Sequence, residues 1–273
     1  MSECTHNCST CSASCGERQE PQSFLAAANE GSHVKKVIGV VSGKGGVGKS
    51  LVTSLLASTL QKSGKQAAIL DADITGPSIP RIFGVKGPVL SNGKEMLPKE
   101  SQGGVKLMSV NLLLNSDEDP VVWRGSIISN VVKQFWSDVI WGDVDCMFVD
   151  MPPGTGDVPL TVFQSLPLDG IIVVTSPQEL VGMIVGKAVK MAELMNIPVL
   201  GLVENYSYFR CPDCGAIHSI YGESHAEELA EKYGIANVCR LPIDPALASF
   251  CDRGLLEQLD TDYVKDLVSV IAE

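Results

Sequence analysis

An eight-residue segment, Gly43–Ser50, constrains the fold most strongly because it matches the phosphate-binding pattern G-x-x-x-x-G-K-[ST]. Its glycines let successive backbone N–H groups turn inward and form a concave anion site, to which a following helix adds the positive end of its dipole. Residues Lys36–Ser42 (KVIGVVS) are predicted to form a buried strand, and Leu51–Leu60 has apolar residues at helical spacing. A chance match in a glycine-rich turn is the alternative, but the flanking strand and helix favour a phosphate-binding loop (P-loop).

The residue types in this loop predict how a nucleoside triphosphate and Mg²⁺ would be held. Lys49 is placed to reach the β- and γ-phosphates, and the Ser50 hydroxyl is placed to coordinate Mg²⁺. The preceding residues are expected to cradle the phosphates: Gly43, Lys44, Gly45, Gly46, Val47 and Gly48. Lys44 is one lysine more than an ordinary loop of this kind contains.

Length and charge bound the remaining possibilities. The 273 residues, 45% of them hydrophobic, are enough for one large α/β domain with a full core. A net charge of −11, from 21 basic and 32 acidic residues, argues against nucleic acid as a partner. The chain has no apolar run of membrane-spanning length, and its polar, cysteine-rich start is unlike a signal peptide, so we expect a cytoplasmic protein without a membrane partner.

The chain divides into a tail and one domain. Residues 1–32 are polar and cysteine-rich, and we expect a flexible tail ordered locally, if at all, by a metal. Residues 33–273 alternate predicted strands with predicted helices, which is typical of a doubly wound, mainly parallel α/β sheet of the P-loop NTPase type. After the first strand, the predicted strands are Gln66–Asp71, Val105–Val110, Val144–Asp150, Gly170–Thr175, Pro198–Val203 and Val238–Leu241. The later predicted helices are Ile127–Trp141, Gln178–Met195, Ser224–Tyr233, Ala246–Gln258 and Asp262–Ala272. An insertion at residues 206–222 interrupts the alternation.

Acidic residues follow two of these strands. Asp150 ends the strand Val144–Asp150, where a carboxylate can hold Mg²⁺ directly or through water; a turn-capping Asp is the alternative. Asp71 ends the second strand and Asp73 comes two residues later; both are candidates to orient an attacking water, and a helix cap is the alternative for each.

Recognition of the nucleotide base is predicted near the ends of two later strands. Asn205 follows Pro198–Val203 and could pair its amide with an adenine edge; a turn-forming Asn is the alternative. Pro242 and Asp244 follow the last strand at the same edge of the sheet and are further candidates for base contacts.

Together, the loop with Lys44 and three other segments resemble the Mrp/Nbp/ApbC iron–sulfur cluster carriers. These carriers belong to the deviant-Walker class, with MinD, ParA and the nitrogenase iron protein. The other segments are Asp71–Ser78 (DADITGPS), Asp150–Asp157 (DMPPGTGD) and Val203–Asn205 (VEN), and the resemblance covers about residues 34–273. It implies that two subunits sandwich ATP, that Lys44 touches the partner's nucleotide, and that Asp73 orients the hydrolytic water. Lys44, Lys49 and Asp73 are then the catalytic candidates.

A C-x-x-C pair, Cys211 and Cys214, lies inside the 206–222 insertion. Two thiolates are half of a four-ligand site, and no second C-x-x-C follows within the domain. A two-fold dimer would bring two pairs together and supply four thiolates, for either Zn²⁺ or an iron–sulfur cluster. A redox-active dithiol is a further alternative. The resemblance favours a bridging [4Fe–4S] cluster, because the matching pair in these carriers holds one.

The tail contains a second candidate metal site, Cys4-x₃-Cys8-x₂-Cys11-x₃-Cys15. Four thiolates this close can wrap a [4Fe–4S] cluster or Zn²⁺, and a tail whose thiols have no role is the alternative. Some carriers of this family have an N-terminal cluster-binding extension with wider outer spacing, so only the inner pair, Cys8 and Cys11, matches it. Cys146 lies in an apolar strand and is expected in the core.

These observations lead to one hypothesis and two rivals. We expect a slow ATPase that works as a homodimer, binds an iron–sulfur cluster between its subunits and transfers it to apoproteins. One rival is an ATP-gated positioning protein of the ParA/MinD kind, which the acidic charge and acidic last helix argue against. The other is an ATP-coupled electron donor like the nitrogenase iron protein. The cluster cysteines of that protein are single and well separated, and the pair Cys211 and Cys214 does not resemble them.

Overall fold

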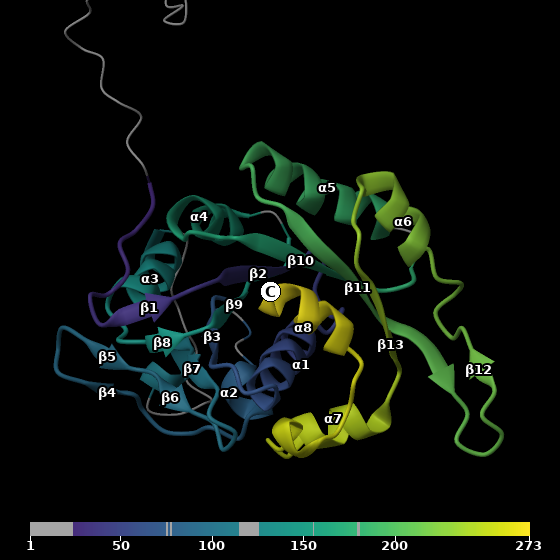
Figure 1. The fold of residues 1–273 in the computed structure, drawn as a ribbon, viewed down its shortest axis with the longest axis horizontal. Coiled ribbons are helices and arrows are strands. Elements are labelled where there is room, and N and C mark those ends of the chain that lie inside the picture. The colour runs from purple at the N-terminus through teal and green to yellow at the C-terminus, as the bar shows by residue number, and fades with distance from the viewer. Residues whose placement is uncertain (1–23, 75, 77, 115–125, 155, 179–180) are drawn as a thin grey trace, which may run out of the picture.

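A computed structural model describes residues 24–74, 76, 78–114, 126–154, 156–178 and 181–273. In these residues a mainly parallel sheet of nine strands lies between two layers of helices (Figure 1). The helices are α1 (Lys49–Lys62), α2 (Ile79–Ile82), α3 (Ser126–Ser137), α4 (Asp157–Ser165), α5 (Val181–Leu194), α6 (Ala226–Tyr233), α7 (Pro245–Asp252) and α8 (Lys265–Ala272), with 3₁₀ turns at Val110–Leu113 and Leu256–Gln258.

The large sheet has the strand order β12-β11-β10-β2-β9-β3-β7-β6, with β13 also paired to β11. Its strands are β2 (Val37–Ser42), β3 (Ala67–Asp71), β6 (Lys99–Glu100), β7 (Lys106–Met108), β9 (Cys146–Asp150), β10 (Gly170–Thr175), β11 (Val199–Arg210), β12 (Ile217–His218) and β13 (Val238–Pro242). Two small sheets pair β1 (Ser32–Val34) with β8 (Gly142–Val144) and β4 (Leu90–Ser91) with β5 (Met96–Leu97).

The strand order gathers the predicted nucleotide-binding segments at one edge. β2, which leads into the P-loop, lies between β9 and β10, and all three run parallel. β9 also pairs in parallel with β3, which aligns Asp71 with Asp150. Because the carboxyl ends of parallel strands meet at the same edge of a sheet, the P-loop, Asp150 and the segment after Asp71 converge there.

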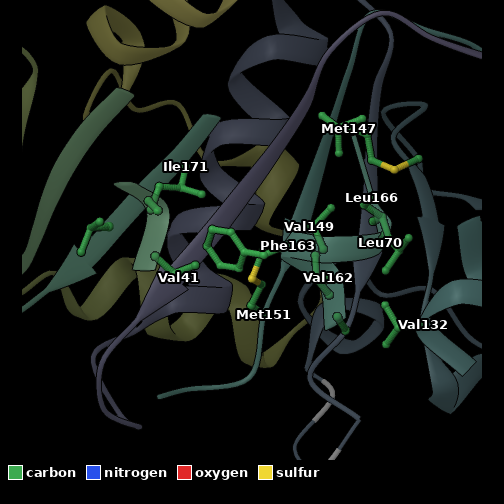
Figure 2. Packing of buried hydrophobic residues seen from close by; sticks show 14 of the residues in the cluster. Val41, Leu70, Val132, Met147, Val149, Met151, Val162, Phe163, Leu166 and Ile171 are labelled. Carbon is green, nitrogen blue, oxygen red and sulfur yellow. The ribbon is translucent and has the colours of Figure 1, made fainter. Parts of the chain in front are cut away.

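Two hydrophobic clusters fill the space between the sheet and its helices. Alternate residues of the central strands face opposite clusters, as Val41 and Val40 of β2 do. In Figure 2, strand residues such as Val149 and Ile171 share one cluster with Val162 and Phe163 of α4. The other face packs on α1 and α8, the C-terminal helix (Figure 1). Burial on both faces explains why these strands are apolar throughout rather than alternating.

The sequence predicted the predominantly parallel α/β fold correctly, but it placed some elements wrongly. The strand predicted to end at Val203 runs on to Arg210, so the insertion at 206–222 begins inside β11 and continues into β12. Helix α4 (Asp157–Ser165) was not among the predicted helices. The two small sheets and α2 were not anticipated. The tail residues 1–23 lie outside the described part of the chain, and no helix in the described part is long and apolar enough to span a membrane.

Candidate functional site

The P-loop folds into a concave turn at the start of α1. Gly46 and Gly48 adopt left-handed backbone conformations with φ of 79° and 81°, which glycine reaches without steric cost. Gly48 is the N-cap of α1, and its carbonyl accepts the first helical hydrogen bond, from Val52 N–H at 3.0 Å. The open N–H groups of this helix end therefore point toward the cavity, where they and the helix dipole favour an anion.

A cavity of about 270 Å³ lies against this turn. Besides the loop itself, Ser42, Asp73, Ser78 and Pro153 line it, so three segments distant in sequence enclose one space. The structure thus brings together the P-loop, the segment after β3 and the segment after β9, as the sequence predicted.

Lys49 is buried beside acidic side chains. Its side chain is 6% exposed, and Nζ lies 2.7 Å from Asp150 Oδ1 and 3.8 Å from Asp73 Oδ2. A buried ammonium needs such partners, because desolvation of an unpaired charge is costly. Lys49 also lines the cavity, so its ammonium group is a counter-charge for an anion bound there.

The donor set at Asp150 fits a magnesium ion. Asp150 is fully buried, and its Oδ2 accepts a 2.6 Å hydrogen bond from the Ser50 hydroxyl. The Thr53 hydroxyl lies 2.8 Å from Asp150 Oδ1 and so fixes the carboxylate from the other side. Ser50 and Asp150 are hard oxygen donors next to a phosphate site, which is the environment Mg²⁺ prefers. Thr53 was missed by the sequence analysis, although its place one helical turn after Lys49 could have suggested it.

Asp71 does not line the cavity but lies buried behind it. Its Oδ2 accepts a hydrogen bond from Ser109 Oγ at 2.9 Å, and its Oδ1 accepts one from the backbone N–H of Asp73 at 3.2 Å. Burial, and next the nearby Asp150 carboxylate, raise the pKa of Asp71 to about 8. Asp71 therefore holds the backbone at Asp73, and Asp73 is the residue of the pair that faces the cavity.

This raised pKa predicts a pH dependence of stability for the nucleotide-free chain. Because the folded state binds the Asp71 proton more tightly than the unfolded state, Asp71 stabilises the fold at low pH, and this contribution is lost as the pH rises from about 4 through about 8. We expect Asp71→Asn to flatten that decline and to raise the free energy of unfolding at pH 8. Urea unfolding at pH 5 to 8 measures it, with the exposed Asp260→Asn as control. Parallel pH curves for wild type and Asp71→Asn would contradict the assignment.

Lys44 contacts a different partner from Lys49 and is more exposed. Its side chain lies over the cavity and its Nζ donates a hydrogen bond to Gln178 Oε1 at the end of the segment after β10. Its backbone carbonyl accepts a hydrogen bond from Ser42 Oγ at 3.1 Å. The extra lysine is therefore held by an exposed contact that a competing anion can displace. Gln178 was not singled out in the sequence.

The candidates for base contacts fall into two places. Asn205 is buried and donates from Nδ2 to the Val47 carbonyl at 2.9 Å, so it contacts the P-loop backbone. Pro242 and Asp244 line a separate cavity of about 470 Å³. Asp244 caps α7 by accepting from Ala246 N–H at 2.8 Å, and its other oxygen accepts from the Tyr263 hydroxyl at 3.0 Å. A contact with the base stays a prediction for all three.

The C-x-x-C pair forms a tight turn at the tip of the β11–β12 hairpin. Gly215 N–H donates to the Cys211 carbonyl at 2.9 Å, and Cys211 N–H donates to the Ala216 carbonyl at 2.8 Å. Hydrogen bonds from the backbone N–H groups of Cys214 and Asp213, and then from the Cys214 thiol, lower the pKa of Cys211. A turn that directs backbone N–H groups at sulfur stabilises a thiolate, which is the form that binds metal.

The rest of a metal site is not found near this pair. Cys211 is partly exposed and Cys214 is exposed. Among the residues that the structure describes, no group of three or more His, Cys, Asp or Glu side chains is arranged to hold a metal ion. The pair is therefore a half-site within this part of the chain. Cys146 is buried in β9, where burial raises its pKa to about 12, which confirms its place in the core. Cys4, Cys8, Cys11 and Cys15 lie outside the described residues.

Comparisons with known proteins point to one family. The model of a ParA-group family described as NUBPL iron-transfer P-loop NTPase matches residues 33–273. An iron–sulfur cluster carrier protein of Methanocaldococcus jannaschii is 39% identical over 100% of this chain and 98% of its own length. One of Clostridium perfringens is 43% identical over 83% of this chain and 82% of its own length.

Solved structures agree with this fold. A nucleotide-binding protein from Archaeoglobus fulgidus in complex with ADP, with cobalt, is 43% identical, covers 85% of this chain and 91% of its own and has a TM-score of 0.77. The septum site-determining protein MinD of Pyrococcus horikoshii with Mg-ADP is 19% identical, covers 86% of this chain and 94% of its own and has a TM-score of 0.64. At that identity the second likeness shows the fold alone.

Proposed function

Since this chain belongs to the family of NUBPL iron-transfer P-loop NTPases, we propose that it is an ATP-hydrolysing carrier of iron–sulfur clusters. The observation that carries the proposal is the turn at Cys211 and Cys214, which stabilises a thiolate yet offers only half of a metal site. The curated relatives named iron–sulfur cluster carrier proteins support the same function. The cluster is cargo here, taken up at this turn and passed on to apoproteins.

The nucleotide site supports ATP with Mg²⁺ as the energy source. Lys49 supplies a cation for the β- and γ-phosphates, and Ser50 with Asp150 supplies oxygen ligands for Mg²⁺, which neutralises charge on the phosphates when bound. Asp73, which lines the same cavity with its Oδ2 at 3.8 Å from Lys49 Nζ, is the candidate to orient the attacking water. We expect this hydrolysis to be slow.

A homodimer completes both sites. Two C-x-x-C turns that meet across a two-fold axis supply four thiolates, the number that a [4Fe–4S] cluster requires. Lys44, held by Gln178 at the rim of the cavity, is exposed enough to reach a second subunit's nucleotide. The thiolate turn and the Lys44 contact are each incomplete in one chain. A single two-fold dimer would complete both, which supports the dimer over a separate explanation for each feature.

Metal analysis of anaerobically purified protein tests the proposal. We expect about four iron and four sulfide per two chains at the hairpin. The full chain is compared with a variant that has Cys4, Cys8, Cys11 and Cys15 replaced by Ser, so that any metal in the tail is subtracted. Zinc without sulfide, or no metal at all in the variant, would contradict the cluster proposal, and the second result would favour the ATP-gated positioning function.

A further inference from the structure

Strand β11 departs from regular geometry at the point where it passes the P-loop. It pairs with β13 at Glu204 and Arg240, and again at Tyr208 and Pro242. Residues 205–207 of β11 therefore lie opposite the single residue Leu241, which makes a β-bulge. Bulges commonly re-aim side chains next to functional sites. This one carries Asn205 and Tyr206.

Tyr206 has an unusual backbone conformation within the bulge. Its φ is 59°, and among the described non-glycine residues only Asn196 shares a positive φ. Asn tolerates this region, but for a bulky aromatic residue it is a true outlier. Such strain persists only where surrounding contacts impose it, and it is concentrated at sites that switch or bind ligands.

The bulge contacts the P-loop directly. Asn205 Nδ2 donates to the Val47 carbonyl at 2.9 Å. Gly48, the N-cap of α1, has no room for a side chain because a Cβ there would overlap the Asn205 amide and lie 3.3 Å from the Tyr206 hydroxyl oxygen. The two side chains therefore lie directly against the peptide units that form the phosphate cradle, so that a movement of the cradle would displace them.

The same bulge contacts the cysteine hairpin through both of its arms. β11 continues from Tyr206 to Arg210 and enters the turn at Cys211. On the returning arm, the Tyr221 ring packs on the Tyr206 ring, with centroids 6.2 Å apart and planes at 58°. Figure 1 shows β11 running without a break from beside β10 to the hairpin at the edge of the molecule. The path from phosphate cradle to thiolates is a few residues of one strand.

We propose that Tyr206 is a positioning residue that couples occupancy of the P-loop to the placement of the Cys211–Cys214 turn. Nucleotide binding alters the cradle at Val47 and Gly48, the strained bulge follows, and the hairpin shifts with it. In this proposal the bulge and the hairpin have two arrangements, and bound nucleotide shifts the equilibrium between them. Coupling between distant sites requires an element of this kind. That the turn carries a cluster rests on the proposed function; the motion itself does not.

Hydrogen–deuterium exchange reads this motion without a cluster. We compare the metal-free chain with and without saturating Mg-ADP, at a concentration where it does not self-associate. In the wild type, we expect exchange in peptides covering 207–222 to change by about 5-fold or more, the lower end of typical couplings. Tyr206→Asn keeps the left-handed backbone and removes the ring. In this variant, Mg-ADP should change the exchange rate of the same peptides by less than about 2-fold. Tyr206→Phe, which removes only the hydroxyl, should give an intermediate factor.

Tyr233→Phe is the matched control, because it removes a hydroxyl from α6, away from the P-loop, and it should behave as the wild type does. ADP affinity, measured alongside, sets the Mg-ADP concentration at which each variant is saturated, so that every variant is compared in its fully bound state. The proposal would be overturned if Mg-ADP left hairpin exchange in the wild type unchanged. It would also be overturned if Mg-ADP changed hairpin exchange in Tyr206→Asn as much as in the wild type. If Tyr206→Asn fails to fold, Tyr206→Phe with the full wild-type factor overturns it. None of these outcomes depends on iron, so failure here is distinguishable from failure of the cluster proposal.

Discussion

Replacement of Lys49 by alanine is expected to abolish nucleotide-dependent activity. The ammonium group is the one cation buried at the carboxylates of the described cavity, with Asp150 at 2.7 Å and Asp73 at 3.8 Å. Its loss removes the charge that balances the transferring phosphoryl group, and loss of one such preorganised group typically costs about 10²- to 10³-fold in rate. ATP hydrolysis and ATP-dependent cluster transfer should both fall by at least that factor, measured as phosphate release and as activation of an apoprotein.

Lys44→Ala is the matched control, because it removes the other lysine of the same loop. In a single chain Lys44 contacts Gln178 rather than the buried carboxylates, so its loss should leave ADP affinity within about 3-fold of the wild type while it lowers hydrolysis by the dimer. The Lys49→Ala chain also leaves Asp150 buried without its cation, and thermal unfolding should be measured in parallel. Full hydrolysis by folded Lys49→Ala protein would contradict the assigned role.

Replacement of Cys211 by serine is expected to remove the hairpin cluster. Each chain offers two thiolates here, so one substitution deletes two of the four ligands of a symmetric dimer, and serine oxygen is a poor ligand for iron–sulfur clusters. In a chain whose tail cysteines are already serine, bound iron and sulfide should fall to about a tenth or less of the unsubstituted level. Iron and sulfide assays with visible absorbance measure this.

Two comparisons make that result specific. Cys251→Ser, on α7, removes a partly exposed thiol whose pKa burial raises to about 11, and it should keep the cluster. ADP affinity of Cys211→Ser should match the wild type, because the turn is outside the residues that line the P-loop cavity. A cluster that survives in the Cys211→Ser, Cys214→Ser double variant would place the cargo site elsewhere.

The central fold was predictable because its determinants are local. Strands such as β2 and β10 are continuous apolar runs that end at glycine-rich or polar turns, so their positions follow from the residues alone. The P-loop pattern then fixes which strand leads into which helix, and parallel connection brings Asp150 to the same edge. The convergence of Lys49, Ser50 and Asp150 follows from those three steps.

What escaped prediction depends on contacts between distant segments. Asp71 and Asp73 have the same local pattern, and only the packing of Ser109 and β9 shows that Asp71 is buried while Asp73 faces the cavity. The bulge at Asn205 and Tyr206 leaves no mark in the sequence, because it is defined by pairing with β13, over thirty residues later. The strand therefore looked finished at Val203 when it runs to Arg210.

The short stretch of β11 between Tyr208 and Cys211 also limits how such a chain can vary in length. Beyond the bulge, Phe209 and Arg210 pair with His218 and Ile217 of β12. Successive side chains in a strand point to opposite faces, so one inserted or deleted residue here would turn over the strand residues that follow it and break their pairing with β12. We therefore expect substitutions in this stretch to be tolerated better than insertions or deletions. Natural length variation in this region should therefore occur after Tyr221, beyond the paired residues of β12 and beyond the ring that packs on Tyr206.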